Sequence, residues 1–143
     1  MRSPRGLTTC APKRPTSVRY VLDSTLLIDH ANRDEPASEL LQRLHSERHE
    51  LYTCDVVTCE TLSQGDTSHL RHLRSLLDAL EYVATSPEAA RWAAGSRLRR
   101  HRAGGKVGLG DSLIAGVAAQ LGAIVVTRNR PDFERQGIEV LTY

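Results

Sequence analysis

Near the C-terminus, the residues Ile124-Val125-Val126 form a continuous apolar run of β-branched residues. The run does not alternate between apolar and polar residues, and such a strand is typical of a parallel sheet that is covered on both faces. Parallel strands need long crossover connections, which are usually helices. The run therefore predicts an α/β protein with helices on both sides of a short sheet.

Strand-like and helix-like segments alternate along the rest of the chain. We expect strands at residues 18–22, 51–54, 123–127 and 139–142, the last at an edge of the sheet. We expect helices at residues 26–31, 36–44, around residue 60, and at 70–80, 87–103 and 111–121. This order predicts a three-layer α/β/α sandwich around a short, mainly parallel central sheet.

The chain of 143 residues has room for one domain with a core but not for two. Residues 1–17 hold three prolines, four basic residues and no acid, so we expect a disordered tail there and a single domain over residues 18–143. Subtracting these four charges from the formal net charge of +2 leaves −2 for the domain. Binding to a polyanion would therefore need a local basic patch.

The three cysteines, Cys10, Cys54 and Cys59, show neither a disulfide pattern nor a metal-ligand spacing, which fits a reducing compartment. No apolar run approaches the roughly 18 residues that a membrane span needs. Residues 1–17 also lack the apolar segment of a secretory signal. We expect a cytoplasmic protein without membrane contact.

Acidic and amide side chains follow the predicted strands. Asp23 follows the first strand, and Asn129 and Asp132 follow the buried C-terminal strand. Functional groups gather at the carboxyl ends of such strands. Glu60 and Asp111 lie near the starts of helices that could point at the same edge.

A group of carboxylates at one edge has chemical consequences. Neighbouring carboxylates raise one another's pKa and stay ionised at neutral pH only if a cation compensates their charge. Oxygen ligands without His or Cys favour Mg²⁺ or Mn²⁺ over zinc. Such an ion can activate a water molecule for phosphodiester hydrolysis.

Each acid also has a purely structural interpretation. Asp23 and Asp111 could cap the helices that follow them. Glu60 could be a solvated helix residue, and Asp132 a turn residue beside Pro131. Taken singly, these residues leave both interpretations open.

Three segments around these acids resemble motifs of the PIN-domain nucleases. Residues 20–25, Tyr-Val-Leu-Asp-Ser-Thr, are similar to the opening of these nucleases, where an aspartate ends the first strand. Residues 110–115, Gly-Asp-Ser-Leu-Ile-Ala, are similar to their Asp-x-Leu-Ile-Ala helix. Residues 127–133, Thr-Arg-Asn-Arg-Pro-Asp-Phe, resemble a segment of the VapC-type toxins of bacterial toxin–antitoxin pairs. The resemblance covers residues 18–143.

The resemblance implies a PIN-like fold and a toxic endoribonuclease that hydrolyses RNA phosphodiester bonds with Mg²⁺ or Mn²⁺. It implies that Asp23 and Asp111 hold the metal directly and that Glu60 completes the ligand set or acts through a bound water. Asn129 or Asp132 would supply a fourth polar position. The match around Glu60 is looser than the others, and Thr25 stands where relatives often have Asn or Ser.

The resemblance also implies a cognate antitoxin protein and a homodimer. The apolar leucine face of residues 70–80 is a candidate surface for such packing.

The stretch before Asp111 is the most basic in the chain. We predict contacts with the RNA backbone from its basic residues, namely Arg97, Arg99, Arg100, Arg102 and Lys106. The structural alternative is that cations near a helix C-terminus only complement the helix dipole.

Two other functions compete with the ribonuclease. A phosphatase could use Asp23 as its nucleophile, but such enzymes typically carry a second aspartate two positions later, where this chain has Thr25. A non-catalytic module could bind RNA or a partner through the same fold. The presence of all three core acids, Asp23, Glu60 and Asp111, counts against that module.

Overall fold

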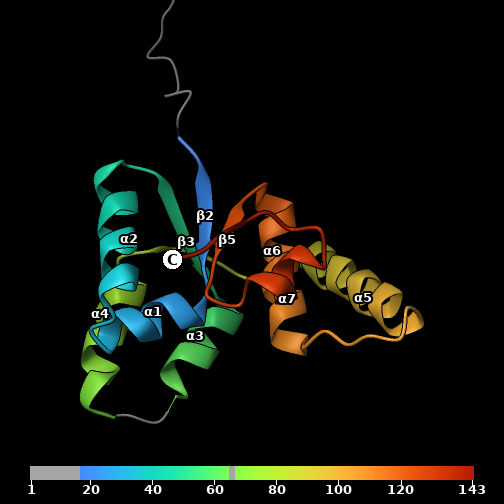
Figure 1. Ribbon diagram of the computed structural model, residues 1–143, viewed down its shortest axis with the longest axis horizontal. Coiled ribbons are helices and arrows are strands. Elements are labelled where there is room, and N and C mark those ends of the chain that lie inside the picture. The colour runs from blue at the N-terminus through green and yellow to red at the C-terminus, as the bar shows by residue number, and fades with distance from the viewer. Residues whose placement is uncertain (1–16, 65–66) are drawn as a thin grey trace, which may run out of the picture.

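The computed structural model describes residues 17–64 and 67–143. Within them, five strands form one sheet in the order β4-β3-β2-β5-β6, and every neighbouring pair is parallel. Helices lie on both faces of this sheet (Figure 1). The predicted α/β/α sandwich is therefore confirmed, whereas the predicted tail falls, apart from Ser17, outside the described residues.

The strands are β2 (Arg19–Leu22), β3 (Glu50–Cys54), β4 (Glu81–Val83), β5 (Ile124–Val126) and β6 (Val140–Leu141). The α-helices before β4 are α1 (Ser24–Ala31), α2 (Glu35–Ser46), α3 (Asp55–Leu62) and α4 (Leu70–Asp78), and a 3-10 turn (Thr67–His69) precedes α4. The α-helices after β4 are α5 (Pro87–Arg102), α6 (Leu109–Leu121) and α7 (Arg130–Glu134).

Three elements differ from the sequence prediction. The sequence pattern does not predict the short edge strand β4, because its exposed Glu81 and Tyr82 give no apolar signal. Helix α7 was also missed, since five residues around Pro131 are too few to show a helical period. Helix α6 begins at Leu109 with Gly108 as its N-cap, so Asp111 lies inside the first turn rather than at the helix start.

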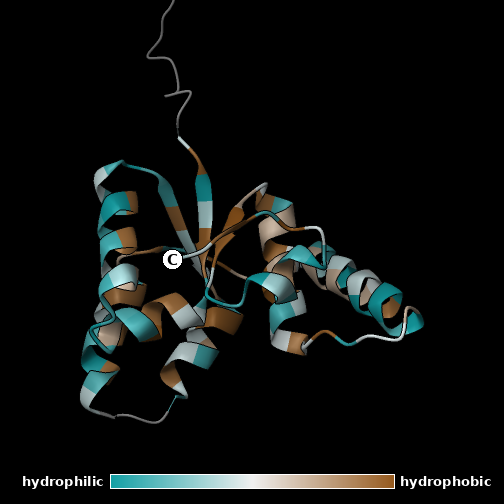
Figure 2. Cartoon of the chain, in the orientation of Figure 1, coloured by the Kyte–Doolittle hydropathy of each residue, from teal (hydrophilic) through white to brown (hydrophobic). Residues whose placement is uncertain are grey.

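The core lies along the two central strands. Val21 and Leu22 of β2 pair beside Val125 and Val126 of β5, and all four side chains are fully buried. Figure 2 shows hydrophobic residues on these strands and on the helix faces that meet them. Helix cover on both sides explains why the C-terminal apolar run does not alternate.

The leucine face of α4 packs inside the protein. Leu73 and Leu77 are only 3% and 7% exposed, and they belong to the core. Helix α4 lies against α1 and α3, so its amphipathic stripe is already covered. The expectation that this face serves as a dimer surface is therefore wrong.

Helices α5 and α6 form the tightest helix pair. Gly116 of α6 faces Ala89 of α5 so closely that a Cβ atom at Gly116 would lie 2.4 Å from the Ala89 carbonyl oxygen. This pairing holds the base of α5, whose basic C-terminal end extends away from the sheet (Figure 1). No helix within residues 17–64 and 67–143 is long and apolar enough to cross a membrane.

Candidate active site

The candidate site lies at the carboxyl ends of the central strands. From β2 the chain crosses to β3 on one side, and β5 pairs with β2 on the other. Sheets of this kind bind ligands at such a switch in strand order. Asp23 directly follows β2 and Thr127 directly follows β5, and the Asp23 amide donates to the Val126 carbonyl at 3.0 Å.

Asp23 is the most deeply buried acid of the site, with 1% of its surface exposed. Its Oδ2 accepts hydrogen bonds from the Thr127 hydroxyl at 2.7 Å and the Thr25 hydroxyl at 3.2 Å. Its Oδ1 is buried and has no hydrogen-bond partner among the described residues. A buried carboxylate oxygen without a partner is costly, so Oδ1 is suited to bind a cation.

The capping interpretation of Asp23 does not account for its side chain. Asp23 occupies the N-cap position of α1, yet its carboxylate makes no capping hydrogen bond. The carboxylate instead turns to Thr127 across the sheet.

Glu60 reaches the same place from α3. Its Oε1 accepts a hydrogen bond from the Ser24 hydroxyl at 3.1 Å. Its Oε2 lies against the first turn of α6, where a Cβ atom at Gly110 would be only 2.4 Å away. Glu60 thus fits beside α6 because residue 110 has no side chain.

Asp111 and Asp132 complete the group. Burial, the charges of Asp23, Asp132 and Glu60, and a hydrogen bond with Asp132 together raise the pKa of Asp111 to about 7, and burial is the largest of these causes. Such a bond between two carboxyl groups needs a proton on one of them. We call Asp23, Glu60, Asp111 and Asp132 the acidic cluster.

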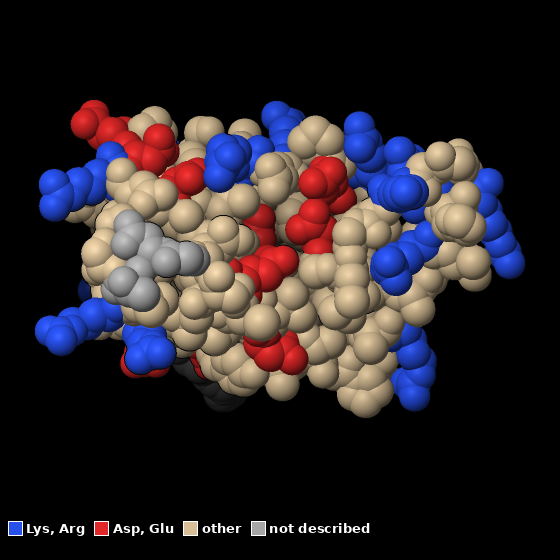
Figure 3. All heavy atoms as spheres, turned by 90° about the horizontal axis from the view of Figure 1, so that it is seen from below, with Lys and Arg blue, Asp and Glu red and all other residues tan. Residues whose placement is uncertain are grey.

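The pKa values of Asp23 and Glu60 are raised for similar reasons. Burial also raises the pKa of Asp23. Hydrogen bonds from the Thr127 and Thr25 hydroxyls and the Ser24 backbone amide oppose this increase, as does the charge of Arg128. Burial is the main cause of the raised pKa of Glu60, which the charge of Asp23 increases further and the hydrogen bond from Ser24 lowers. Figure 3 shows acidic side chains together at the centre of this face, with basic side chains on the side of α5.

Asn129, the other candidate for the fourth position, lies differently. It is exposed and forms the N-cap of α7 without a side-chain capping bond. Its backbone amide donates to the Thr127 hydroxyl at 2.9 Å. In the described part of the chain, the contacts of the acidic cluster extend to Asp132 and not to the Asn129 side chain.

The donor chemistry of the acidic cluster fits Mg²⁺ or Mn²⁺, because all its donors are carboxylate oxygens and Asp23 Oδ1 is unpartnered. As they stand, no three Asp, Glu, His or Cys side chains of the described residues are arranged to hold an ion. Carboxylates that repel one another separate unless a proton or a cation joins them. A divalent cation would offset this repulsion.

Sequence reasoning gave no role to three residues that shape the acidic cluster. Thr127 orients Asp23, Ser24 orients Glu60, and Gly110 makes room for Glu60. The position of Thr127 could have been predicted from the sequence, because a residue directly after a buried parallel strand lies at the same edge of the sheet as Asp23. The contacts of Ser24 and Gly110 depend on the placement of α3.

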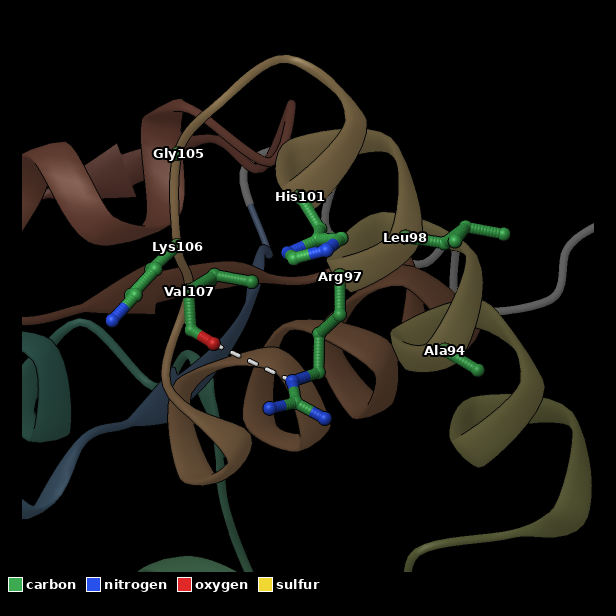
Figure 4. Close-up of a pocket in the computed structure, with 7 residues that line it drawn as sticks. All are labelled: Ala94, Arg97, Leu98, His101, Gly105, Lys106 and Val107. Atoms are coloured by element: carbon green, nitrogen blue, oxygen red, sulfur yellow. Dashed lines mark hydrogen bonds between the residues drawn. The ribbon is translucent and has the colours of Figure 1, made fainter.

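The predicted RNA-binding residues lie on α5 and on the loop that follows it. Arg97 and Lys106 line a hollow of about 480 Å³, together with Leu98, His101 and Val107 (Figure 4). Arg97 Nε donates to the Val107 carbonyl at 3.4 Å, which ties the loop to the helix. Arg99 and Arg102 are exposed, and Arg100 is half-buried.

Comparisons with known proteins agree with this fold. The family model for the PIN domain matches residues 20–138. A chain of VapBC2 from Rickettsia felis, solved bound to a promoter DNA fragment, is 20% identical with a TM-score of 0.76, over 88% of this chain and 99% of that one.

Two further structures are similar. A chain of DNA-bound VapBC from Salmonella typhimurium is 24% identical with a TM-score of 0.73, over 87% of this chain and 98% of that one. The sarcin-ricin loop cleaving toxin VapC20 from Mycobacterium tuberculosis is 13% identical with a TM-score of 0.66, over 83% of this chain and 95% of that one. No curated protein sequence matches the chain. Because the family model spans most of its length, the chain belongs to the PIN-domain family, the nuclease family that its motifs resemble.

Proposed function

We propose that the protein is a metal-dependent endoribonuclease and the toxic member of a toxin–antitoxin pair. The observation that carries the proposal is the buried Asp23, which keeps one carboxylate oxygen unpartnered at the centre of the acidic cluster. Membership of the PIN-domain family supports nuclease chemistry. The similarity to VapBC complexes and to an RNA-cleaving VapC toxin supports the choice of RNA and the toxin role.

In this proposal Asp23 and Asp111 bind Mg²⁺ or Mn²⁺, and Glu60 and Asp132 complete the site. The ion supplies an activated water and compensates charge on the scissile phosphate. Thr127 and Thr25 hold Asp23 Oδ2, so Oδ1 would be the oxygen that binds the ion. Glu60 would accept a proton from the attacking water, which its hydrogen bond from Ser24 and its raised pKa support.

The basic residues of α5 and its loop would bind the RNA backbone. A polyanion is repelled by four carboxylates unless cations beside them attract its phosphates. Arg97 lies in α5 and Lys106 lies in the loop between α5 and α6, and both line one hollow. Figure 3 shows basic side chains on the α5 side of the acidic face. Arginines in the last turn of α5 also interact favourably with the helix dipole. This stabilisation and RNA binding can act together.

The proposal includes a cognate antitoxin, a homodimer and a cytoplasmic location. The similar VapBC structures support the antitoxin. A dimer would use a surface other than the leucine face of α4, because Leu73 and Leu77 are buried.

The test is incubation of purified protein with total RNA, with Mg²⁺ or Mn²⁺ and with EDTA. We expect cleavage only with metal, and a loss of at least about 100-fold in Asp23→Asn and Asp111→Asn, because the loss of a ligand exceeds that of an outer-shell contact. Asp78→Asn, at the exposed end of α4, is the matched control. Cleavage that persists in EDTA or in both variants would contradict the proposal. RNA binding without cleavage under any metal would favour the non-catalytic module.

A further inference from the structure

A second hollow, on another face of α5, gathers positive charge. It has a volume of about 160 Å³ and lies between the C-terminal end of α5 and the end of α7. It is lined by Ser96, Arg99, Arg100, Ala103, Arg135 and Gln136. Three arginines from two helix ends therefore line one small space that no acid lines. We call it the arginine hollow.

The arginines of this hollow have no anionic partner among residues 17–64 and 67–143. None of Arg99, Arg100 and Arg135 forms an ion pair within the described part of the chain. The nearby Glu134 pairs instead with Arg130 at 2.8 Å. Arg100 Nε is buried and has no hydrogen-bond acceptor among the described residues. Three neighbouring guanidinium groups repel one another, and a buried N–H without an acceptor is costly, so a bound anion would stabilise both.

The hollow is held in shape by neighbouring contacts. The Arg100 guanidinium lies close to Gly105, where a Cβ atom would be 2.5 Å from Nε. The Ser96 hydroxyl donates to Gln136 Oε1 at 2.9 Å, which joins α5 to the residues after α7. Gln136 Nε2 donates to the Asp132 carbonyl at 2.8 Å. The hollow is thus anchored to the helix that carries one residue of the acidic cluster.

The end of α5 does not repel an anion as strongly as a bare helix C-terminus would. Three of its last four carbonyls are already bonded, because the amides of Ala103, Gly104 and Gly105 donate to Arg99, His101 and Arg100 at 2.9 to 3.1 Å. The dipole of a helix arises largely from such terminal groups when they are unsatisfied. Three guanidinium charges therefore dominate the hollow.

We propose that Arg99, Arg100 and Arg135 form a binding site for a phosphate group. Guanidinium groups donate hydrogen bonds in a planar fork that matches the oxygens of phosphate, and the space suits a small oxyanion. The source we assign is a backbone phosphate of the RNA bound at the acidic cluster, and this part rests on the proposed function. Free inorganic phosphate shares the same chemistry.

The first experiment titrates inorganic phosphate into the full-length protein at constant ionic strength, and follows the arginine Nε–H signals by NMR. We expect the Arg100 signal to shift and saturate. Arg100→Gln and Arg135→Gln should each weaken phosphate binding by about tenfold, as expected for one lost charge-assisted hydrogen bond. Arg135→Lys should lose less. Arg74→Gln, an exposed charge on α4, should bind as the parent protein does.

The second experiment measures binding of a single-stranded RNA in EDTA over a range of salt concentrations. Removing one phosphate contact should lower the slope of log affinity against log salt by about 0.7. We expect this change in Arg135→Gln and not in Arg74→Gln. Arg135 is exposed, so this variant remains informative even if Arg100→Gln unfolds.

The outcomes separate the two proposals. Absence of phosphate binding in a protein that still cleaves RNA would overturn the arginine hollow as a site and leave the proposed function intact. Phosphate binding in a protein that cleaves no RNA would support the site and overturn the proposed function. Phosphate binding with an unchanged RNA salt slope in Arg135→Gln would support the site but overturn RNA as its ligand. Tighter binding of a glutamate-rich peptide than of RNA would overturn it in favour of a protein partner.

Discussion

Gly110→Ala is the substitution that separates the proposed chemistry from the stability of the fold. A Cβ atom at this position would lie 2.4 Å from Glu60 Oε2, and the next contact, with the carboxyl carbon of Glu60, is at an ordinary 3.4 Å. The obstructing atom is the end of a flexible side chain, so the helix can keep its place while the carboxylate moves. We therefore expect the fold to tolerate the change.

The magnitude follows from the geometry. Glu60 Oε2 must move by about 1 Å to reach an ordinary contact distance, and a displacement of that size can cost about 100-fold in rate. Alanine also stabilises a helix by up to about 1 kcal/mol relative to glycine. The expected result is a loss of RNA cleavage between tenfold and about 100-fold with an unchanged or slightly higher melting temperature.

The assay pairs metal-dependent RNA cleavage with thermal unfolding. Gly108→Ala is the control, because a Cβ atom at this neighbouring position meets nothing within 4 Å. A Gly110→Ala protein that cleaves RNA as fast as the parent, while Glu60→Gln is inactive, would refute the placement of Glu60. A loss of activity that accompanies unfolding would refute the reasoning on stability.

Three further predictions concern the acidic cluster and the helix pair behind it. Thr127→Val removes the 2.7 Å hydrogen bond that lowers the pKa of Asp23, so cleavage at neutral pH should fall by at least about tenfold and recover in part at higher pH; a pH-independent loss would contradict this. The folded protein holds a proton on Asp111 up to about pH 7, whereas the unfolded chain releases it near 3.8, so in EDTA the stability from this group should fall as pH rises between these values. Melting curves should show that the stability of Asp111→Asn falls less with rising pH than that of the parent protein. An equal fall would contradict the raised pKa of Asp111. Gly116→Ala should destabilise the protein in urea, because crowding the Ala89 carbonyl costs about 1–3 kcal/mol and exceeds the gain in helix propensity; a more stable variant would refute the close packing.

The sequence was sufficient to predict the layers of the fold. Ile124 to Val126 indicated a strand covered on both faces, and the structure places it beside β2 at the centre of the sheet. The apolar stripe from Leu70 to Leu80 correctly indicated a helix. It could not show whether that stripe faces the core or a partner, because both surfaces are equally apolar.

The candidate site was less predictable than the fold. Asp23 and Asp111 stand in motifs, so their spacing along the chain pointed to a common edge of the sheet. The meeting of Glu60 with Gly110 depends on where α3 packs, which no local pattern encodes. Likewise, Arg135 follows a helix too short to be predicted, so its approach to Arg99 and Arg100 was not expected.

Mn²⁺ binding followed by electron paramagnetic resonance tests whether the acidic cluster binds the divalent ion through Asp23. Titration of the RNA-free protein with Mn²⁺ should give saturable binding that is competed by Mg²⁺. Asp23→Asn should weaken Mn²⁺ binding by at least about tenfold, because the substitution removes the negative charge of the buried carboxylate whose Oδ1 is unpartnered. Binding of the same number of ions with the same affinity in Asp23→Asn would show that Asp23 does not hold the ion.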